Sequence, residues 1–209
     1  MRFLLHNMLF WMALFAAILL QAVSVNINLD IDENGALQGS TEYVIPNKSA
    51  GLLKGLSREL SYGDNLGPLD EEAVKRHFAQ SEAVILDAYH VYTIPNGQRI
   101  RLDFSAPSAR DAFASGLLGE ISLDDAQNPD ERLFIAKLPK QTVDWNPQRA
   151  AFARKLLEAV DGLEMTLHLQ TPTPLQQTTG VVDSSNQCHW RLDLGDLMQK
   201  ELPSIQARY

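Results

Sequence analysis

Residues 25–45 read VNINLDIDENGALQGSTEYVI, and the pattern of their side chains predicts a β-hairpin. Over residues 25–31 every second side chain is apolar, and the side chains between them are Asn or Asp. A period of two is typical of a strand with one buried face. Asn34 and Gly35 form a dipeptide that favours a tight turn. Residues 36–45 are therefore expected to return as the second strand.

Further strands are predicted on both sides of the middle of the chain. Residues 84–94 and 99–104 flank a Pro-Asn-Gly sequence and are expected to form a second hairpin. Shorter apolar or alternating segments predict strands at residues 133–138, 163–169, 181–182 and 188–194. The tail after Pro203 closes the chain without a predicted strand.

Helical spacing of apolar residues predicts helices at residues 49–60, after Asp70, at 107–114 and at 146–160. Asp70 is expected to cap its helix, with Val74, His77 and Phe78 on the apolar side. Because strands and helices do not alternate regularly, a doubly wound sheet is not expected. The predicted fold class is α+β: a mixed, mostly antiparallel sheet built from hairpins, with helices packed on one face.

The N-terminal segment indicates export. Residues 8–20 are all apolar, a run that is short for a membrane span but suits the core of a signal peptide. Ala22 and Ser24 are small residues at suitable positions for cleavage after Ser24. An uncleaved signal anchor is the close alternative. We expect residues 1–24 to be a signal peptide or anchor, and residues 25–209 to form an extracytoplasmic domain that is membrane-anchored or secreted.

Composition argues against nucleic-acid binding and against an intrachain disulfide. The formal net charge is −8, and a chain this acidic lacks the clustered Lys and Arg that contact phosphates, so nucleic acid is not an expected partner. The single cysteine, Cys188, excludes an intrachain disulfide. Its expected role is that of a small buried residue.

Two acidic segments resemble cation sites without completing one. Residues 30–35 begin like a calcium loop, D-x-D-x-N-G, but the twelfth position holds Thr41 where a bidentate Glu is required. Residues 124–131 are also acidic, and a solvated loop explains them. The histidines show no metal-ligand spacing, and we find no nucleophile, phosphate-loop or dinucleotide motif. No catalytic residue, metal ligand or cofactor is therefore predicted, and the chain is not expected to be an enzyme.

Trp190 and Trp145 are the candidate ligand-lining residues, because aromatic walls are common in pockets. Trp190 lies in an alternating strand, so core packing is its competing role.

Two regions together resemble the LppM-type envelope lipoproteins. The first is the hairpin of residues 25–45, and the second is residues 171–194, a Pro/Thr loop followed by Gly180, Asp183 and Trp190. The resemblance implies an α+β envelope domain that is membrane-tethered, binds a lipid or another apolar ligand and carries no catalytic residues. Members of that family are lipidated on a cysteine after the signal. This chain has none there, so any tether is the apolar segment itself.

We therefore expect a non-catalytic binding module in the cell envelope, with a lipid or another apolar ligand held between sheet and helices. The alternative is a structural or assembly subunit of a membrane-associated complex, with protein partners and an exposed apolar patch. A hydrolase with a dispersed site is a third class.

Overall fold

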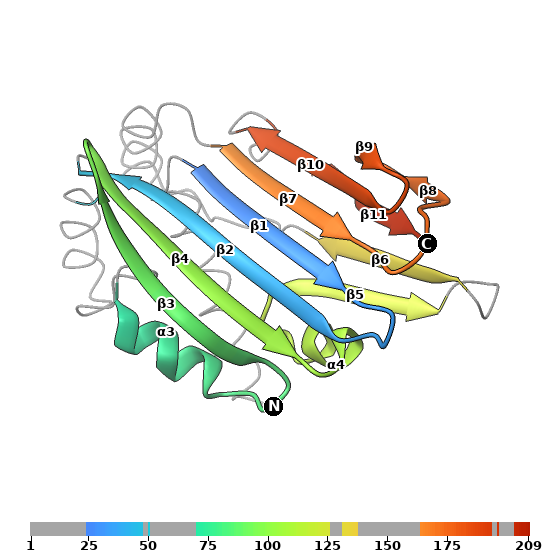
Figure 1. Ribbon diagram of the computed structural model, residues 1–209, viewed down its shortest axis with the longest axis horizontal. Helices are drawn as coiled ribbons and strands as arrows, with labels where there is room; N and C mark the ends of the chain where they lie inside the picture. Colours follow the sequence, from blue (N-terminus) through green and yellow to red (C-terminus); the bar gives the residue numbers. More distant parts are fainter. Residues whose placement is uncertain are drawn as a thin grey trace, which may run out of the picture.

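The structure is a computed structural model of the chain, and it describes residues 24–47, 50, 70–125, 131–137, 164–193, 196 and 203–209. The described residues form two β-sheets and two short helices (Figure 1). The N-terminal segment and the predicted helices at 49–60 and 146–160 lie outside these residues, apart from residue 50.

The larger sheet, called the large sheet below, has seven strands in the order β3-β4-β2-β1-β7-β10-β9. In that order they are Ile85–Ile94, Gly97–Ala106, Leu37–Pro46, Ser24–Ile31, Glu164–Gln170, Gln187–Asp193 and Val181–Ser184. Among these strands β1 and β7 pair in parallel, and the other neighbours pair antiparallel. The hairpin predicted from residues 25–45 is therefore the centre of a mixed, mostly antiparallel sheet.

The small sheet has four antiparallel strands in the order β5-β6-β11-β8. They are Glu120–Asp125, Arg132–Lys137, Ile205–Arg208 and Gln177–Thr178. Only β6 was predicted as a strand. β11 lies in the tail after Pro203, and it becomes a strand because its backbone pairs with β6 on one side and β8 on the other. Both partners are distant in sequence.

The two described helices begin as their sequences predict. At the start of α3 (Glu71–Phe78) the Asp70 side chain accepts a hydrogen bond from the backbone amide of Ala73. At the start of α4 (Ala109–Ala114) the Ser108 hydroxyl accepts one from the backbone amide of Asp111. Side-chain acceptors of this kind satisfy amides that have no partner within the helix. Val74, His77 and Phe78 of α3 are buried, as predicted.

The two hairpin turns use glycine for different reasons. Gly35 has φ of +80°, in the left-handed region that favours glycine. The turn after β3 is formed instead by Pro95 and Asn96, since Ile94 pairs directly with Gly97 at the start of β4. A Cβ at Gly97 would lie 2.3 Å from the carbonyl oxygen of Ile45, so close strand packing requires glycine there.

The core lies between the two sheets. Phe134 of β6 stacks on Trp190 of β10 with ring centroids 6.1 Å apart, and it meets Phe113 of α4 at 5.8 Å. Phe78 of α3 meets Phe104 of β4 at 6.0 Å. The small sheet and both described helices thus pack on the same face of the large sheet.

This arrangement corrects the predicted fold class in one respect. The described chain is mostly β, and a second sheet, rather than helices alone, covers the inner face of the large sheet. The prediction missed much of this layer because β11 and β8 have only four and two residues, too few for an alternating pattern to be recognised.

Candidate functional site

The outer face of the large sheet is polar because its strands alternate. In β1, Val25, Leu29 and Ile31 are buried toward the core, while Asn26, Asn28 and Asp30 point the other way. The register places equivalent polar residues beside them on both neighbouring strands. Asn28 lies between Ser40 of β2 and His168 of β7.

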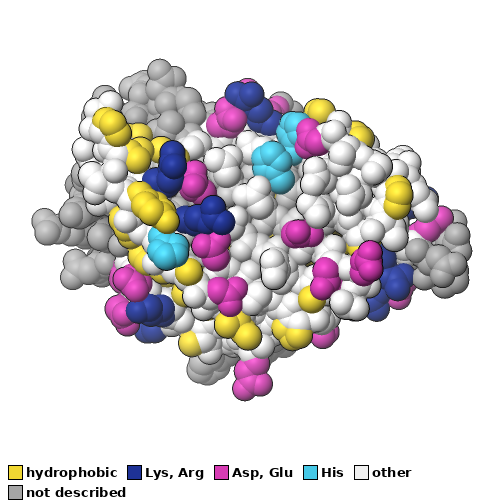
Figure 2. Space-filling view, viewed as in Figure 1, with side chains coloured by type: hydrophobic (Ala, Val, Ile, Leu, Met, Phe, Trp, Pro, Cys, Tyr) yellow, Lys and Arg dark blue, Asp and Glu magenta, His cyan; other side chains and the backbone are white. Residues whose placement is uncertain are grey.

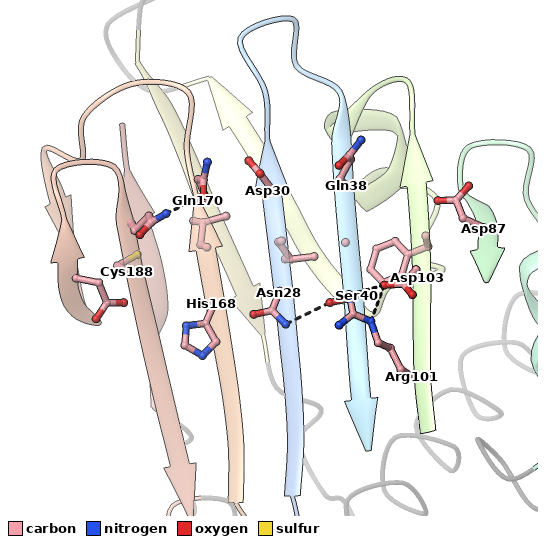
Figure 3. A pocket seen from close by; sticks show the side chains of 16 residues that line it. Asn28, Asp30, Gln38, Ser40, Asp87, Arg101, Asp103, His168, Gln170 and Cys188 are labelled. Carbon is pink, nitrogen blue, oxygen red and sulfur yellow. Dashed lines mark hydrogen bonds and ion pairs between the residues drawn. The ribbon is translucent and has the colours of Figure 1, made fainter. Parts of the chain in front are cut away.

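This polar face is hollowed into an open cavity of about 530 Å³. Figure 3 shows its side chains on β10, β7, β1, β2, β4 and β3. Figure 2 shows the same face, where hydrophobic side chains gather mainly toward the β3 side. Its polar lining residues are Asn28, Asp30, Gln38, Ser40, Asp87, Arg101, Asp103, His168, Gln170, Asp183 and Gln187. The polar part of the lining thus consists mainly of amide and carboxylate groups.

The cavity is acidic. Its lining contains Asp30, Asp87, Asp103 and Asp183 against a single arginine, Arg101. That arginine is already neutralised, since its Nη2 and Nε lie 2.8 and 2.9 Å from Asp103 Oδ1. The remaining carboxylates oppose the binding of an anion and favour neutral or cationic groups.

Several cavity side chains hold one another across the strands. Asn28 Nδ2 donates to Ser40 Oγ at 3.2 Å, and Gln187 Nε2 donates to Gln170 Oε1 at 2.7 Å. Cross-strand hydrogen bonds of this kind fix the direction of both partners. The face is therefore partly organised before any ligand arrives.

At one side of the cavity, His168, Asp183 and His189 come together from three adjacent strands. His168 of β7 and His189 of β10 are register partners, with ring centroids 5.5 Å apart and ring planes inclined by 34°. His189 Nδ1 lies 2.9 and 2.8 Å from the two carboxylate oxygens of Asp183. Figure 2 shows neighbouring histidine side chains with acidic side chains beside them on this face.

A β-bulge brings Asp183 to this position. Gln187 pairs with Ser184, but the next residue, Cys188, pairs with Val182, so Asp183 is an extra residue on β9. Bulges re-aim side chains in this way. Without the extra residue, strict alternation would give this part of β9 a different set of side chains on the outer face.

The predicted site residues lie elsewhere or outside the described chain. Trp190 is 6% exposed, packs in the core against Phe134 and donates its Nε1 hydrogen to Thr179 Oγ1 at 3.0 Å. It does not line the cavity described above, and its role in a ligand wall remains a prediction. Trp145 lies outside the described residues.

One described residue of each acidic segment, Asp32 and Asp125, already binds groups of the protein itself. Asp32 Oδ1 accepts the amides of Asn34 and Ala36, both at 2.8 Å, which supports the turn and not a calcium loop. Asp125 forms ion pairs with Arg110 at 2.5 Å and Arg132 at 3.1 Å. The guanidinium of Arg110 lowers the pKa of this carboxyl.

Cys188 is buried, as predicted, at 1% exposure. Burial raises the pKa of its thiol.

In the described parts of the chain no helix is long and apolar enough to cross a membrane, and residues 8–20 lie outside those parts.

The histidine cluster is the feature that sequence spacing missed. His168 and His189 are 21 positions apart, and only the register of β7 with β10 makes them neighbours. Cys188 and His189 point to opposite sides of β10, as strand alternation requires. The sequence signal that could have indicated this cluster was that each of two predicted strands carries a histidine at an outward-facing position.

Comparison with known proteins supports the architecture. No family model matches the chain, and no curated protein is similar to it in sequence. Among solved structures, the folded domain of Mycobacterium tuberculosis LppM, determined by NMR, has a TM-score of 0.51 at 14% sequence identity. The match covers 88% of this chain and 87% of that chain. The fold is distantly LppM-like. At this identity the similarity concerns the fold alone.

Proposed function

We propose that the chain is a non-catalytic, extracytoplasmic binding module that holds a polar ligand on the outer face of the large sheet, in place of the lipid or other apolar ligand between sheet and helices that we expected from the sequence. The open cavity of about 530 Å³ on the outer face of the large sheet carries this proposal. Its size falls within the range of small-molecule sites. Location in the cell envelope is supported by the apolar run at residues 8–20 and by the distant LppM-like fold.

The chemistry of the cavity favours a ligand rich in hydroxyl or amino groups. Amide groups such as those of Asn28 and Gln170 donate and accept, and carboxylates such as Asp30 accept hydrogen bonds from such a ligand. An isolated phosphate would meet an excess of negative charge. If the ligand is a lipid, the polar face suits an uncharged or cationic headgroup, and the acyl chains would need a different surface.

Native mass spectrometry of the full chain, extracted gently from membranes with its own N-terminus, tests this proposal. We expect a bound adduct that is weakened in Asn28→Leu and Gln38→Leu, since each replaces a polar group of the cavity. Gln206→Leu on β11 is the matched control, because it makes the same kind of change on an exposed position of the small sheet.

Equal adduct in all three variants would refute the location. A bare chain would be examined further by NMR with a neutral oligosaccharide. If the amide resonances of β1, β2 and β7 did not shift, a polar ligand would be refuted as well.

The alternative function, a subunit of a membrane-associated complex, has its own observation. Among the described strands, β3 and β9 each pair on one side only. Both expose apolar side chains: Ile85, Val91 and Tyr92 on β3 are 57%, 48% and 48% exposed, and Val181 and Val182 on β9 are 61% and 57% exposed. Exposed strand edges of this kind can pair with another chain. This candidate predicts a copurifying protein that Val91→Lys or Val181→Lys releases, while the adduct is unchanged.

A further inference from the structure

We propose that His168, Asp183 and His189 form a binding site for a divalent first-row transition metal ion, represented by Zn²⁺. Each residue offers one ligand atom, and these atoms all lie within 4.8 Å of one another. Zinc bonds of 2.0–2.1 Å in tetrahedral geometry keep neighbouring ligand atoms about 3.3 Å apart. The largest separation therefore has to close by only about 1.5 Å, which rotation of side chains can supply.

The backbone already places the three residues for this purpose. His168 and His189 are direct partners on adjacent antiparallel strands, so their rings leave the sheet side by side on its outer face. Both strands lie inside the large sheet, each with a neighbour on either side. Ligands on such rigid elements need little reorganisation when an ion binds.

Asp183 completes the set through the β-bulge in β9. Its carboxylate reaches His189 Nδ1 at 2.8 Å, so it can ligate the ion itself or hold the ring while the other ring nitrogen ligates. The Asp183 and His189 side chains are 40% and 26% exposed. An ion can therefore reach the cluster from solvent without opening the fold.

The donor set selects the class of ion. Two imidazoles and one carboxylate suit zinc and its first-row neighbours, whereas Ca²⁺ and Mg²⁺ prefer sites made of oxygen alone. Three protein ligands, or the two histidines alone when Asp183 holds the ring of His189, leave at least one coordination position open. Since His168 and Asp183 also line the cavity, an oxygen of a bound ligand could occupy that position. This last step rests on the proposed binding function, while metal binding itself does not.

The test uses the full chain without a polyhistidine tag, freed of metal by a chelator and titrated with ZnCl₂ in a calorimeter. We expect one Zn²⁺ per chain, and binding at least about 10-fold weaker in His168→Gln and in His189→Gln. His90→Gln is the matched control, because His90 is an exposed histidine on the same sheet, on β3, whose register partner is Arg101. It should bind Zn²⁺ as the unaltered chain does.

Electron paramagnetic resonance with Cu²⁺ supplies a second readout, in which two coordinated nitrogens should be lost one at a time in the two histidine variants. Circular dichroism of the metal-free variants shows whether they fold. Because the two histidines lie on different strands, one variant still tests the site if the other does not fold. No binding at micromolar Zn²⁺, or equal binding in all variants, would overturn the site and leave only the hydrogen bond between His189 and Asp183. Neither result changes the adduct measurement proposed above.

Discussion

Replacing Trp190 by phenylalanine should destabilise the fold without acting directly on the polar cavity. The indole is 6% exposed and stacks on Phe134 with ring planes inclined by 26°. Its Nε1 donates to Thr179 Oγ1 at 3.0 Å, and the same hydroxyl donates to the carbonyl of Ser204 at 2.7 Å. Trp190 therefore helps to join the large sheet to the segment that leads into β11.

The magnitude follows from what the phenyl ring loses. The stack on Phe134 is retained, but the hydrogen bond to Thr179 is lost, at about 1 kcal/mol. The missing part of the buried indole adds about 1–2 kcal/mol of lost burial and residual cavity. We expect the free energy of unfolding to fall by about 2–3 kcal/mol in total. For a chain of this length that corresponds to a fall in Tm of about 5–10 °C.

Urea denaturation followed by far-ultraviolet circular dichroism measures this change, provided that the dependence on urea keeps its slope. Thr179 supplies matched variants. Thr179→Val removes the hydroxyl and should cost about 1–3 kcal/mol, because the indole N–H loses its acceptor. Thr179→Ser retains the hydroxyl and should cost less than about 1 kcal/mol.

A Trp190→Phe variant within about 0.5 kcal/mol of the unaltered chain would refute this reasoning, since a buried, hydrogen-bonded indole cannot be replaced so cheaply. If the variant also lost the adduct seen in native mass spectrometry, Trp190 would belong to a ligand wall, as the sequence allowed.

Three further predictions concern single residues. Burial lowers the pKa of His77 to about 4 from its ordinary 6.5. Between these pH values the unfolded chain therefore binds more protons than the folded chain. The free energy of unfolding should fall as the pH drops through that window, by about 3 kcal/mol at most. Urea titrations across that range should show a smaller fall in His77→Phe, and an unchanged fall would contradict the assignment. Gly35→Ala and Gly97→Ala should each cost about 1–3 kcal/mol in urea, the first through its positive φ and the second through contact with Ile45. Asparagine should be better tolerated than alanine at Gly35 only, and equal tolerance at both positions would count against this distinction. Cys188 should react with a thiol reagent only after unfolding, because it is 1% exposed and burial raises its pKa; rapid labelling of the folded chain would show that the strand opens.

Local structure was largely predictable wherever the signal lay within a few residues. The alternation in residues 25–31 predicts β1, and Asp70 with Val74 and Phe78 predicts the start and the buried side of α3. These features depend on side-chain period and capping, which act between near neighbours. The requirement for glycine at position 97 was not predictable in the same way. It arises because a side chain there would collide with the backbone of β2, which lies about 50 positions earlier in the chain.

The second layer of the fold depended on pairing between distant segments. β11 has only four residues, and it is a strand because β6 and β8 supply hydrogen-bonding partners on both sides. β8 is still shorter, with two residues. Short strands carry too few side chains to show a period, so a sequence pattern cannot distinguish them from loops.

The sequence by itself determined the alternation that makes one face of the large sheet polar, the acidic charge, the helix caps and the apolar N-terminal run. Only the tertiary structure decided which polar side chains share that face. Register brings His168 beside His189, and a bulge adds Asp183 to them. The physical reason is that alternation depends on neighbouring residues, whereas register is set by hydrogen bonding and core packing along the whole sheet. A site made of one residue from each of three strands exists only once that register is chosen.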